Sequence, residues 1–117
     1  MLPKKTWRGA LERADAVALE EMEGVLRQLA HADRLRIIDL LNEAGELPVC
    51  EITRYLGIAQ AATSKHLAQM RRLGLLRAER RGQAVWYSVA DERPVELLRC
   101  VCRCCENRGP AFNGKKR

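Results

Sequence analysis

Apolar residues recur at intervals of three and four positions over most of the chain, and this periodicity predicts a largely helical fold. The first such stretch runs from Asp15 to Leu29, and its apolar positions are Leu19, Met22, Leu26 and Leu29. Asp33 is expected to cap a second helix, Arg34 to Asn42, which Gly45 closes. Further helices are predicted from Val49 to Leu56, from Gln60 to Leu73, and from Asp91 to residue 106.

The segment from Gln60 to Leu73 combines an apolar edge with a polar N-terminal end. The apolar edge, which should pack on a core, consists of Leu67, Met70 and Leu73. The polar side chains at or beside the N-terminal end are Gln60, Thr63, Ser64, Lys65 and His66. Short or amide-bearing side chains of this kind can reach base edges and phosphates in a DNA groove. Taken alone, the pattern also fits an ordinary amphipathic helix with a solvated polar face.

The elements around this segment favour a DNA-binding unit. The helix expected at 49–56 precedes it across a Gly-containing turn, so the pair has the form of a helix-turn-helix. Two β-prone runs, 75–80 and 84–89, follow Gly74 and are joined by a hairpin turn signal at 81–83. The hairpin tip carries Arg80, Arg81 and Gln83. Such a hairpin is expected to act as a wing along the phosphate backbone, and the alternative is a solvated loop.

At 117 residues the chain is most simply one domain with tails. We expect a basic N-terminal arm at 1–14, a folded domain at 15–106 and a flexible basic tail at 107–117. The formal net charge of +6 fits a nucleic-acid partner, and the modest core expected at this size would gain from a dimer interface. No apolar run approaches the roughly 20 residues that span a bilayer, and the first residues lack the apolar stretch of a secretory signal. These features favour a cytoplasmic protein without a membrane partner.

The last predicted helix carries four of the five cysteines: Cys100, Cys102, Cys104 and Cys105. In a cytoplasmic chain this density indicates metal, metalloid or redox chemistry rather than a disulfide framework. Thiolates are soft ligands, so arsenite, antimonite or a soft divalent metal is the expected effector, and no organic cofactor is expected. The pairs 100/104 and 102/105 point to different faces of a helix. Three thiols can therefore meet one ion only if the helix end unwinds or another segment contributes.

Other candidate ligands are weaker. Cys50 falls in the first turn of the third helix, just after Pro48, where the helix dipole favours a reactive thiolate. The simpler interpretation of Cys50 is a buried residue that acts as a small apolar side chain. His66 belongs to the DNA-facing set and His31 to a helix boundary, so neither is expected to be a metal ligand.

Several segments together resemble the ArsR/SmtB family of repressors, and the likeness covers most of the chain between residues 20 and 100. Residues 31–38 resemble the family's Leu-Ala-Asp-x-Thr-Arg-Leu-x-Ile-Leu opening. Residues 46–52 resemble the Glu-Leu-Cys-Val-Cys-Asp-Leu stretch of its arsenic and cadmium/lead sensors. Residues 64–67 and 73–76 are similar to Ser-Arg-His-Leu and Ser-Gly-Leu-Leu, and residues 82–91 to the wing and its exit.

The resemblance implies a homodimeric winged helix-turn-helix repressor, mainly α with a β-hairpin wing, whose first and last helices form the dimer interface. It also implies that the recognition helices enter successive major grooves of operator DNA and that effector binding releases the operator. Carried over by position, the DNA-facing residues are Gln60, Ser64, Lys65 and His66. The chain departs from the family pattern at three positions: Thr63 is usually apolar, Pro48 stands where the metal-sensing relatives have the first of two cysteines, and Arg93 stands where the zinc sensors have a His. These departures argue against a zinc-type site on the last helix and leave only half of the usual cysteine pair in the third helix.

We therefore hypothesise a transcriptional repressor that is released when arsenite, antimonite or another soft metal binds the cysteines of the last helix, with Cys50 as a less favoured ligand. The alternative within the same fold is a thiol-redox or persulfide sensor that uses Cys50 and a cysteine of the last helix. A structural zinc protein is a further alternative. An enzyme such as a thiol-dependent arsenate reductase is not expected, because no phosphate-cradling Gly loop containing a cysteine follows a strand.

Overall fold

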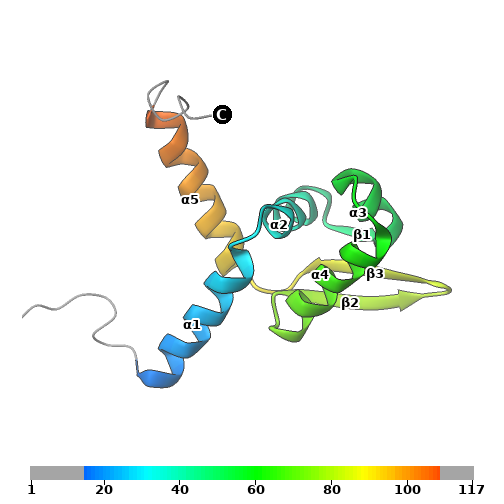
Figure 1. Ribbon diagram of the computed structural model, residues 1–117, viewed down its shortest axis with the longest axis horizontal. Coiled ribbons are helices and arrows are strands. Elements are labelled where there is room, and N and C mark those ends of the chain that lie inside the picture. Colours follow the sequence, from blue (N-terminus) through cyan, green and yellow to red (C-terminus); the bar gives the residue numbers. More distant parts are fainter. Residues whose placement is uncertain (1–14, 109–117) are drawn as a thin grey trace, which may run out of the picture.

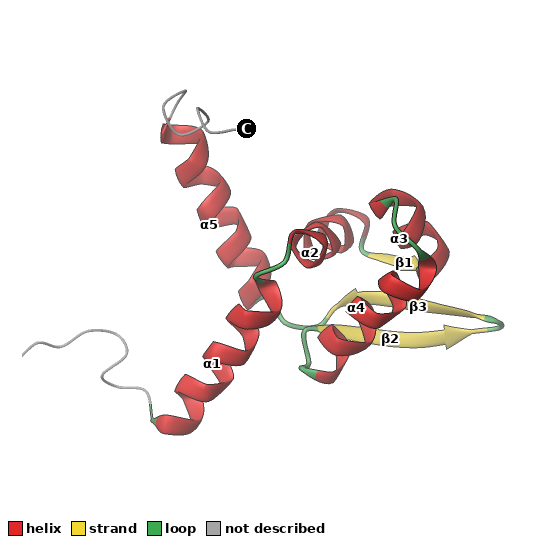
Figure 2. Ribbon diagram, viewed as in Figure 1, coloured by secondary structure: helices red, strands yellow, loops and turns green. Residues whose placement is uncertain are grey.

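The computed structural model describes residues 15–108, which form five helices and one small sheet (Figure 1). The elements in chain order are α1 (Ala16–Leu29), α2 (Ala32–Ala44), β1 (Glu46–Pro48), α3 (Val49–Leu56), α4 (Gln60–Arg72), β2 (Leu76–Arg81), β3 (Ala84–Val89) and α5 (Arg93–Arg108). Helices α2, α3 and α4 lie against the sheet, whereas α1 and α5 leave this body on the side away from the hairpin tip (Figure 2). The predicted architecture, mainly helical with a β-hairpin wing, is confirmed.

A single core joins α2, α3, α4 and the sheet. Its most deeply buried side chains are Ile37, Ile38, Leu41, Ile52, Leu67, Met70 and Leu75. Leu67 and Met70 thus form the apolar edge expected for α4. Leu73 does not belong to this edge and is 43% exposed, because α4 ends at Arg72 and Leu73 is already its C-cap residue.

Polar residues at the helix starts differ in part from expectation. Asp15 caps α1 as predicted, since its carboxylate accepts a hydrogen bond from the Ala18 amide at 2.8 Å. The predicted cap of α2 is wrong: the helix starts at Ala32, and His31 is the N-cap, with Nδ1 accepting from the Asp33 amide at 3.1 Å. Asp33 instead lies in the first turn, where the positive end of the helix dipole stabilises a carboxylate.

The sheet contains one strand more than the sequence predicts. Its strand order is β1-β3-β2, all neighbours are antiparallel, and the three residues of β1 pair with Trp86, Tyr87 and Ser88 of β3. The β2–β3 hairpin turns at Gly82, whose φ of 63° is a conformation that other residues rarely adopt. The hairpin is therefore anchored along β3 by both neighbouring strands, while its tip extends beyond the short β1.

Helix α5 begins as expected and ends later than expected. The Asp91 carboxylate accepts from the Arg93 amide at 2.9 Å and caps the first turn. The helix then continues through all the clustered cysteines to Arg108, so it does not unwind at residue 107, and the tail expected from 107 starts inside the helix. The arm expected at 1–14 and the rest of the tail, 109–117, lie outside the described residues. Among the helices of residues 15–108, none has the length and apolarity that crossing a membrane requires.

Candidate nucleic-acid interface and cysteine sites

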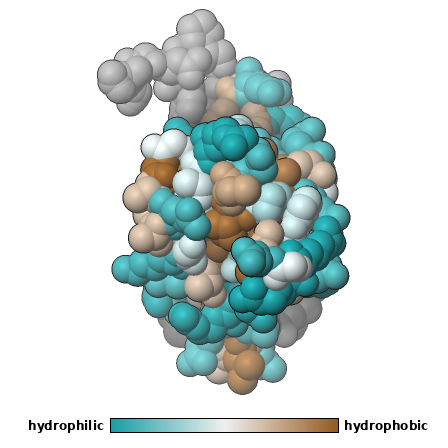
Figure 3. Space-filling model, turned by 90° about the vertical axis from the view of Figure 1, so that its right-hand side faces the viewer, coloured by the Kyte–Doolittle hydropathy of each residue, from teal (hydrophilic) through white to brown (hydrophobic). Residues whose placement is uncertain are grey.

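One face of α4 is exposed, and its side chains are small or basic. Gln60, Ser64 and Lys65 lie on the surface of its N-terminal half, as predicted. Because an α-helix has about 3.6 residues per turn, Lys65 shares its face with three further exposed residues, Ala61, Ala68 and Arg72. Sequence reasoning missed these three, although counting helical positions outward from Lys65 would have identified them. Figure 3 shows the end of the molecule that carries α3 and the hairpin tip, and its surface is mostly hydrophilic with apolar residues interspersed.

Thr63 is not part of this exposed face. Its side chain is fully buried, and its hydroxyl donates to the Ala59 carbonyl at 3.3 Å. Position 63 lies on the side of α4 that carries Leu67 and Met70, four and seven residues further on, and this side packs into the core. The expectation that Thr63 faces DNA is therefore wrong in this structure.

His66 lies at the border between the exposed face and the core. Its Nδ1 accepts a hydrogen bond from Arg34 Nε at 3.0 Å, and its ring packs edge-on against His31 with 4.6 Å between ring centroids. Burial lowers the pKa of His66 below its ordinary value of 6.5, and the Arg34 charge and His31 lower it further. His66 is therefore held as a neutral hydrogen-bond acceptor.

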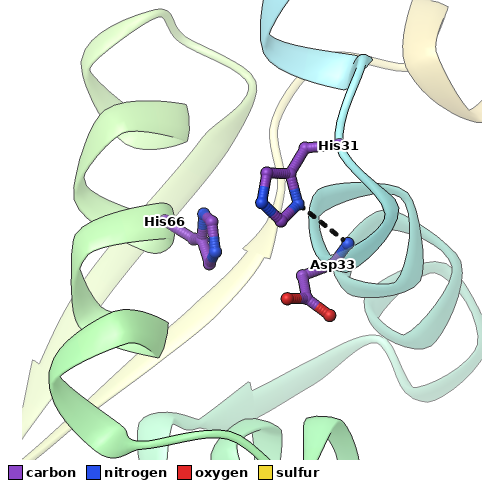
Figure 4. Close-up of side chains that lie close together, drawn as sticks. All are labelled: His31, Asp33 and His66. Carbon is purple, nitrogen blue, oxygen red and sulfur yellow. Dashed lines mark hydrogen bonds between the residues drawn. The ribbon is translucent and has the colours of Figure 1, made fainter.

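His31, Asp33 and His66 are the only three potential metal ligands that lie close together within residues 15–108, with ligand atoms inside 4.8 Å of one another (Figure 4). The hydrogen bonds do not fit a metal site. Both rings already use Nδ1 as an acceptor, so each neutral imidazole carries its proton on Nε2 and has no free lone pair. The Arg34 cation beside His66 further opposes a bound cation. We interpret the group as a polar contact between α2 and α4.

The two arginines near the hairpin tip have different surroundings. Arg81 Nη2 donates to Glu46 at 2.7 Å and to Glu79 at 2.8 Å, and its guanidinium carbon lies 4.8 Å from the centroid of the Trp86 ring. The hydrogen bonds that Arg81 donates lower the pKa of the Glu46 carboxyl. The same bonds, together with the one to Glu79, raise the pKa of Arg81. Among residues 15–108, the one hydrogen bond of the Arg80 side chain is a 3.5 Å contact with the Gly82 carbonyl. Arg80 and the exposed Gln83 are therefore better placed than Arg81 to meet a phosphate.

All five cysteines are free thiols. Cys50 is exposed, so the interpretation of a buried Cys50 is wrong: in the first turn of α3 it lies on the solvent side, whereas Ile52 of the same turn is buried. Cys100, Cys102 and Cys104 are exposed and Cys105 is half-buried. Within residues 15–108 no three cysteines lie close enough to form a ligand set, because the intact α5 directs them to different faces.

Two of these cysteines have distinct neighbours. Cys102 lines a groove of about 330 Å³ between α2 and α5, together with Asp39 and Glu43 of α2. Cys104 follows Leu97 and Val101 at helical spacing, and these two apolar side chains are 40% and 49% exposed.

Helix α1 continues this unpartnered apolar surface. Leu19, Met22 and Leu26 of this helix are 41–48% exposed, and Val17 in its first turn is 69% exposed. Met22 and Leu26 of α1 and Leu97 of α5 line one apolar groove of about 360 Å³. The first and last helices thus present one joined apolar surface, which we call the α1–α5 face.

Known proteins with similar sequences point to one family. Residues 31–78 match the family model described as bacterial regulatory protein, arsR family. The chain is 43% identical over 70 residues to the arsenic resistance transcriptional regulator ArsR1 of Pseudomonas putida, a match spanning 60% of this chain and 55% of that protein. It is 34% identical over 84 residues to the HTH-type transcriptional regulator NmtR of Mycobacterium tuberculosis, spanning 72% of this chain and 69% of that protein.

A solved structure shares the whole described fold. The homodimeric winged helix-turn-helix DNA-binding domain Mb0332 of Mycobacterium bovis superposes with a TM-score of 0.71 at 26% identity, covering 92% of this chain and 95% of that one. Both curated relatives are named as transcriptional regulators and Mb0332 as a possible one, so this is a family of regulators and not of enzymes. The chain therefore belongs to the ArsR family of bacterial winged helix-turn-helix transcriptional regulators.

Proposed function

We propose that the protein is a homodimeric repressor that binds operator DNA through α4 and the hairpin, and that leaves the operator when arsenite, antimonite or another soft ion binds cysteines of α5. The observation that carries the proposal is the exposed face of α4, where small side chains alternate with basic ones beside an arginine-bearing hairpin. A helix with this surface can enter the major groove closely, while Lys65 and Arg80 neutralise phosphates.

In this proposal base edges are met by Gln60 and Ser64, with His66 at the edge of the contact. Their amide, hydroxyl and imidazole groups offer hydrogen bonds to bases. Ala61 and Ala68 leave room for close approach and can contact thymine methyl groups. Arg72, at the other end of the same face, adds a phosphate contact. Arg81 contributes less, because Glu46 and Glu79 already occupy its guanidinium.

The α1–α5 face supports a homodimer. A second copy of the chain would cover apolar side chains that one copy leaves about half exposed. The homodimeric state of the similar Mb0332 domain agrees with this arrangement. Two copies of α4 could then meet successive major grooves.

The effector site is proposed on α5, with thiolates of Cys100, Cys102, Cys104 and Cys105 as ligands. Arsenite suits three thiolates, and the similar ArsR1 is named for arsenic resistance. One intact α5 does not bring three thiols together, so we place the site where two copies meet. Cys104 is the best candidate for a shared ligand, because it continues the apolar stripe of Leu97 and Val101. An ion bound there would change how the two copies pack, and about 1–3 kcal/mol of coupling would suffice to release DNA.

The test is an arsenite titration of the protein bound to a fluorescent operator duplex, at one fixed salt concentration. Arsenite should release the wild-type protein, and Cys104→Ser with Cys105→Ser should abolish the release without weakening DNA binding. Cys50→Ser is the matched control and should keep the full response. A full response in the double variant would reject the α5 site.

The exposure of Cys50 keeps one alternative open, a repressor that senses thiol oxidation or persulfides through Cys50 and a cysteine of α5. Figure 1 shows α3 and α5 on different sides of α2, so such a bond would have to join two copies or follow a rearrangement. Mass spectrometry after exposure to sulfide or peroxide separates the two proposals. A crosslink to Cys50 supports the redox sensor, and intact thiols with bound metalloid support the first proposal.

A further inference from the structure

One arginine joins three helices. Arg34, in the first turns of α2, donates from Nε to His66 Nδ1 at 3.0 Å and from Nη2 to Gln69 Oε1, and both acceptors belong to α4. Its Nη1 donates to the side-chain oxygen of Gln28 and, at 3.4 Å, to the Gln28 carbonyl. Gln28 is the next-to-last residue of α1. Arg34 therefore connects the end of α1 to the middle of α4.

The two helices that Arg34 connects have different tasks. Helix α1 carries the α1–α5 face, and α4 carries the proposed DNA-binding face. Helix α1 packs against α2, whereas α4 packs against α3 and β2. Because Arg34 of α2 donates hydrogen bonds to both α1 and α4, it fixes the position of these two helices relative to each other.

The acceptors around Arg34 are all neutral. They are two amide oxygens, one main-chain carbonyl and one imidazole nitrogen, and no ion pair found within residues 15–108 includes Arg34. What holds the guanidinium is the match between its planar, divergent N–H groups and these acceptors. A lysine keeps the charge, but its single ammonium cannot reach acceptors on two separate helices in the same geometry. His66 can accept only while neutral, and its lowered pKa agrees with that.

We propose that Arg34 is a positioning residue for DNA recognition, which fixes α4 relative to α1 and so sets the spacing of the two recognition helices without contacting DNA. The inference rests on the proposed DNA-binding function and adds to it the group that links the dimer interface to the DNA-binding face. Without this link, each α4 could still meet phosphates, but the two copies would fit successive grooves less well.

The test compares two charge-conserving variants of the full chain, Arg34→Lys and Arg36→Lys. Arg36 is the matched control, because it lies on the same helix, is exposed, and within the described part of the chain its side chain pairs with Asp33 alone, at 3.3 Å. The probes are a duplex selected by the wild-type protein from a random-sequence pool and a scrambled duplex of equal length. Sedimentation at the assay concentration checks that each variant remains a dimer.

Arg34→Lys should raise the dissociation constant for the selected duplex about tenfold, as expected for the loss of hydrogen bonds from a charged group. Binding to the scrambled duplex should change less than about twofold, because nonspecific affinity follows charge, which both variants keep. Arg36→Lys should change neither. If Arg34→Lys keeps the wild-type ratio of the two affinities, the inference is wrong.

Gln28→Ala tests the contact to α1 separately and replaces the first test if Arg34→Lys does not fold. By itself it should weaken binding to the selected duplex and change binding to the scrambled duplex less than about twofold, because the net charge is unchanged. Where Arg34→Lys folds, combining the two changes should cause less loss than the sum of the single changes. Fully additive losses, or none from Gln28→Ala, would overturn the role of α1. A wild-type protein that selects no sequence counts against the proposed function, whereas selectivity that persists in Arg34→Lys counts against this inference alone.

Discussion

His66 packs between two helices of the fold and also borders the proposed DNA-binding face. Its position on α4 next to Lys65 places it at the border of the proposed DNA-binding face, yet its Nδ1 already accepts a hydrogen bond from Arg34. Protonation would place a cation next to the Arg34 cation and remove the acceptor. Stability should therefore depend on the protonation state of this ring.

We predict that the free energy of unfolding falls as the pH decreases through 6.5, the ordinary pKa of histidine. The pKa of His66 is lowered in the folded protein, so in this window the unfolded chain binds more protons than the folded one. Urea unfolding at several pH values should show this decrease, and His66→Gln should reduce it. A titration of the His66 ring by NMR with a midpoint above 6.5 would contradict the prediction.

At the residue scale, sequence reasoning fails where side-chain type and helical position disagree. Thr63 is polar, and its type indicated exposure, but its spacing from Leu67 and Met70 places it in the core, where its hydroxyl bonds to Ala59. Cys50 shows the opposite error: cysteines are often buried, yet this one lies on the solvent side of the first turn of α3. Position on the helix decides in both cases, because the backbone fixes which face meets the core.

At the element scale, the helices and the hairpin were predictable because each carries its own signal, a period of apolar residues or a turn with Gly. Strand β1 was not predictable. Its three residues contain a proline and have no period, and they form a strand only because β3 lies alongside. The start of α2 depended on the same kind of nonlocal contact, since His31 caps the helix while its ring packs against His66.

The hairpin supports a prediction that separates its two arginines. Arg80→Gln should lower the salt dependence of DNA binding by about one unit of slope, because one phosphate contact is lost. Arg81→Gln should lower it less, since the Arg81 guanidinium is already bound to Glu46 and Glu79. Arg81→Gln should instead alter the fluorescence of Trp86, over which Arg81 lies, and Arg80→Gln should not. Equal slopes for the two variants would show that the surroundings of Arg81 do not matter.

At the scale of the whole molecule, the α1–α5 face is the feature that one copy of the chain leaves unexplained. The sequence indicated amphipathic helices at both ends, but it could not say which apolar residues pack inward. Leu29 and Val95 are buried in the core, whereas their neighbours Leu26 and Leu97 remain 48% and 40% exposed. Which of these residues are buried depends on the directions in which α1 and α5 extend from the rest of the fold. The spacing of apolar residues within each helix does not predict these directions.

If a second copy covers this face, a charge placed there should prevent dimerisation without unfolding the chain. Leu97→Glu and Val101→Glu put carboxylates where one copy is solvated but a dimer interface would be dry, and burying an unpaired charge is strongly unfavourable. Sedimentation equilibrium should show monomers with unchanged helical circular dichroism. Affinity for a duplex with two half-sites should fall to that for a single half-site, because the two α4 helices no longer act together. Tyr55→Glu, which changes an aromatic side chain on α3 that is 54% exposed, is the control and should remain dimeric. A Leu97→Glu, Val101→Glu protein that still dimerises would place the interface elsewhere, and the shared cysteine site on α5 would lose its basis.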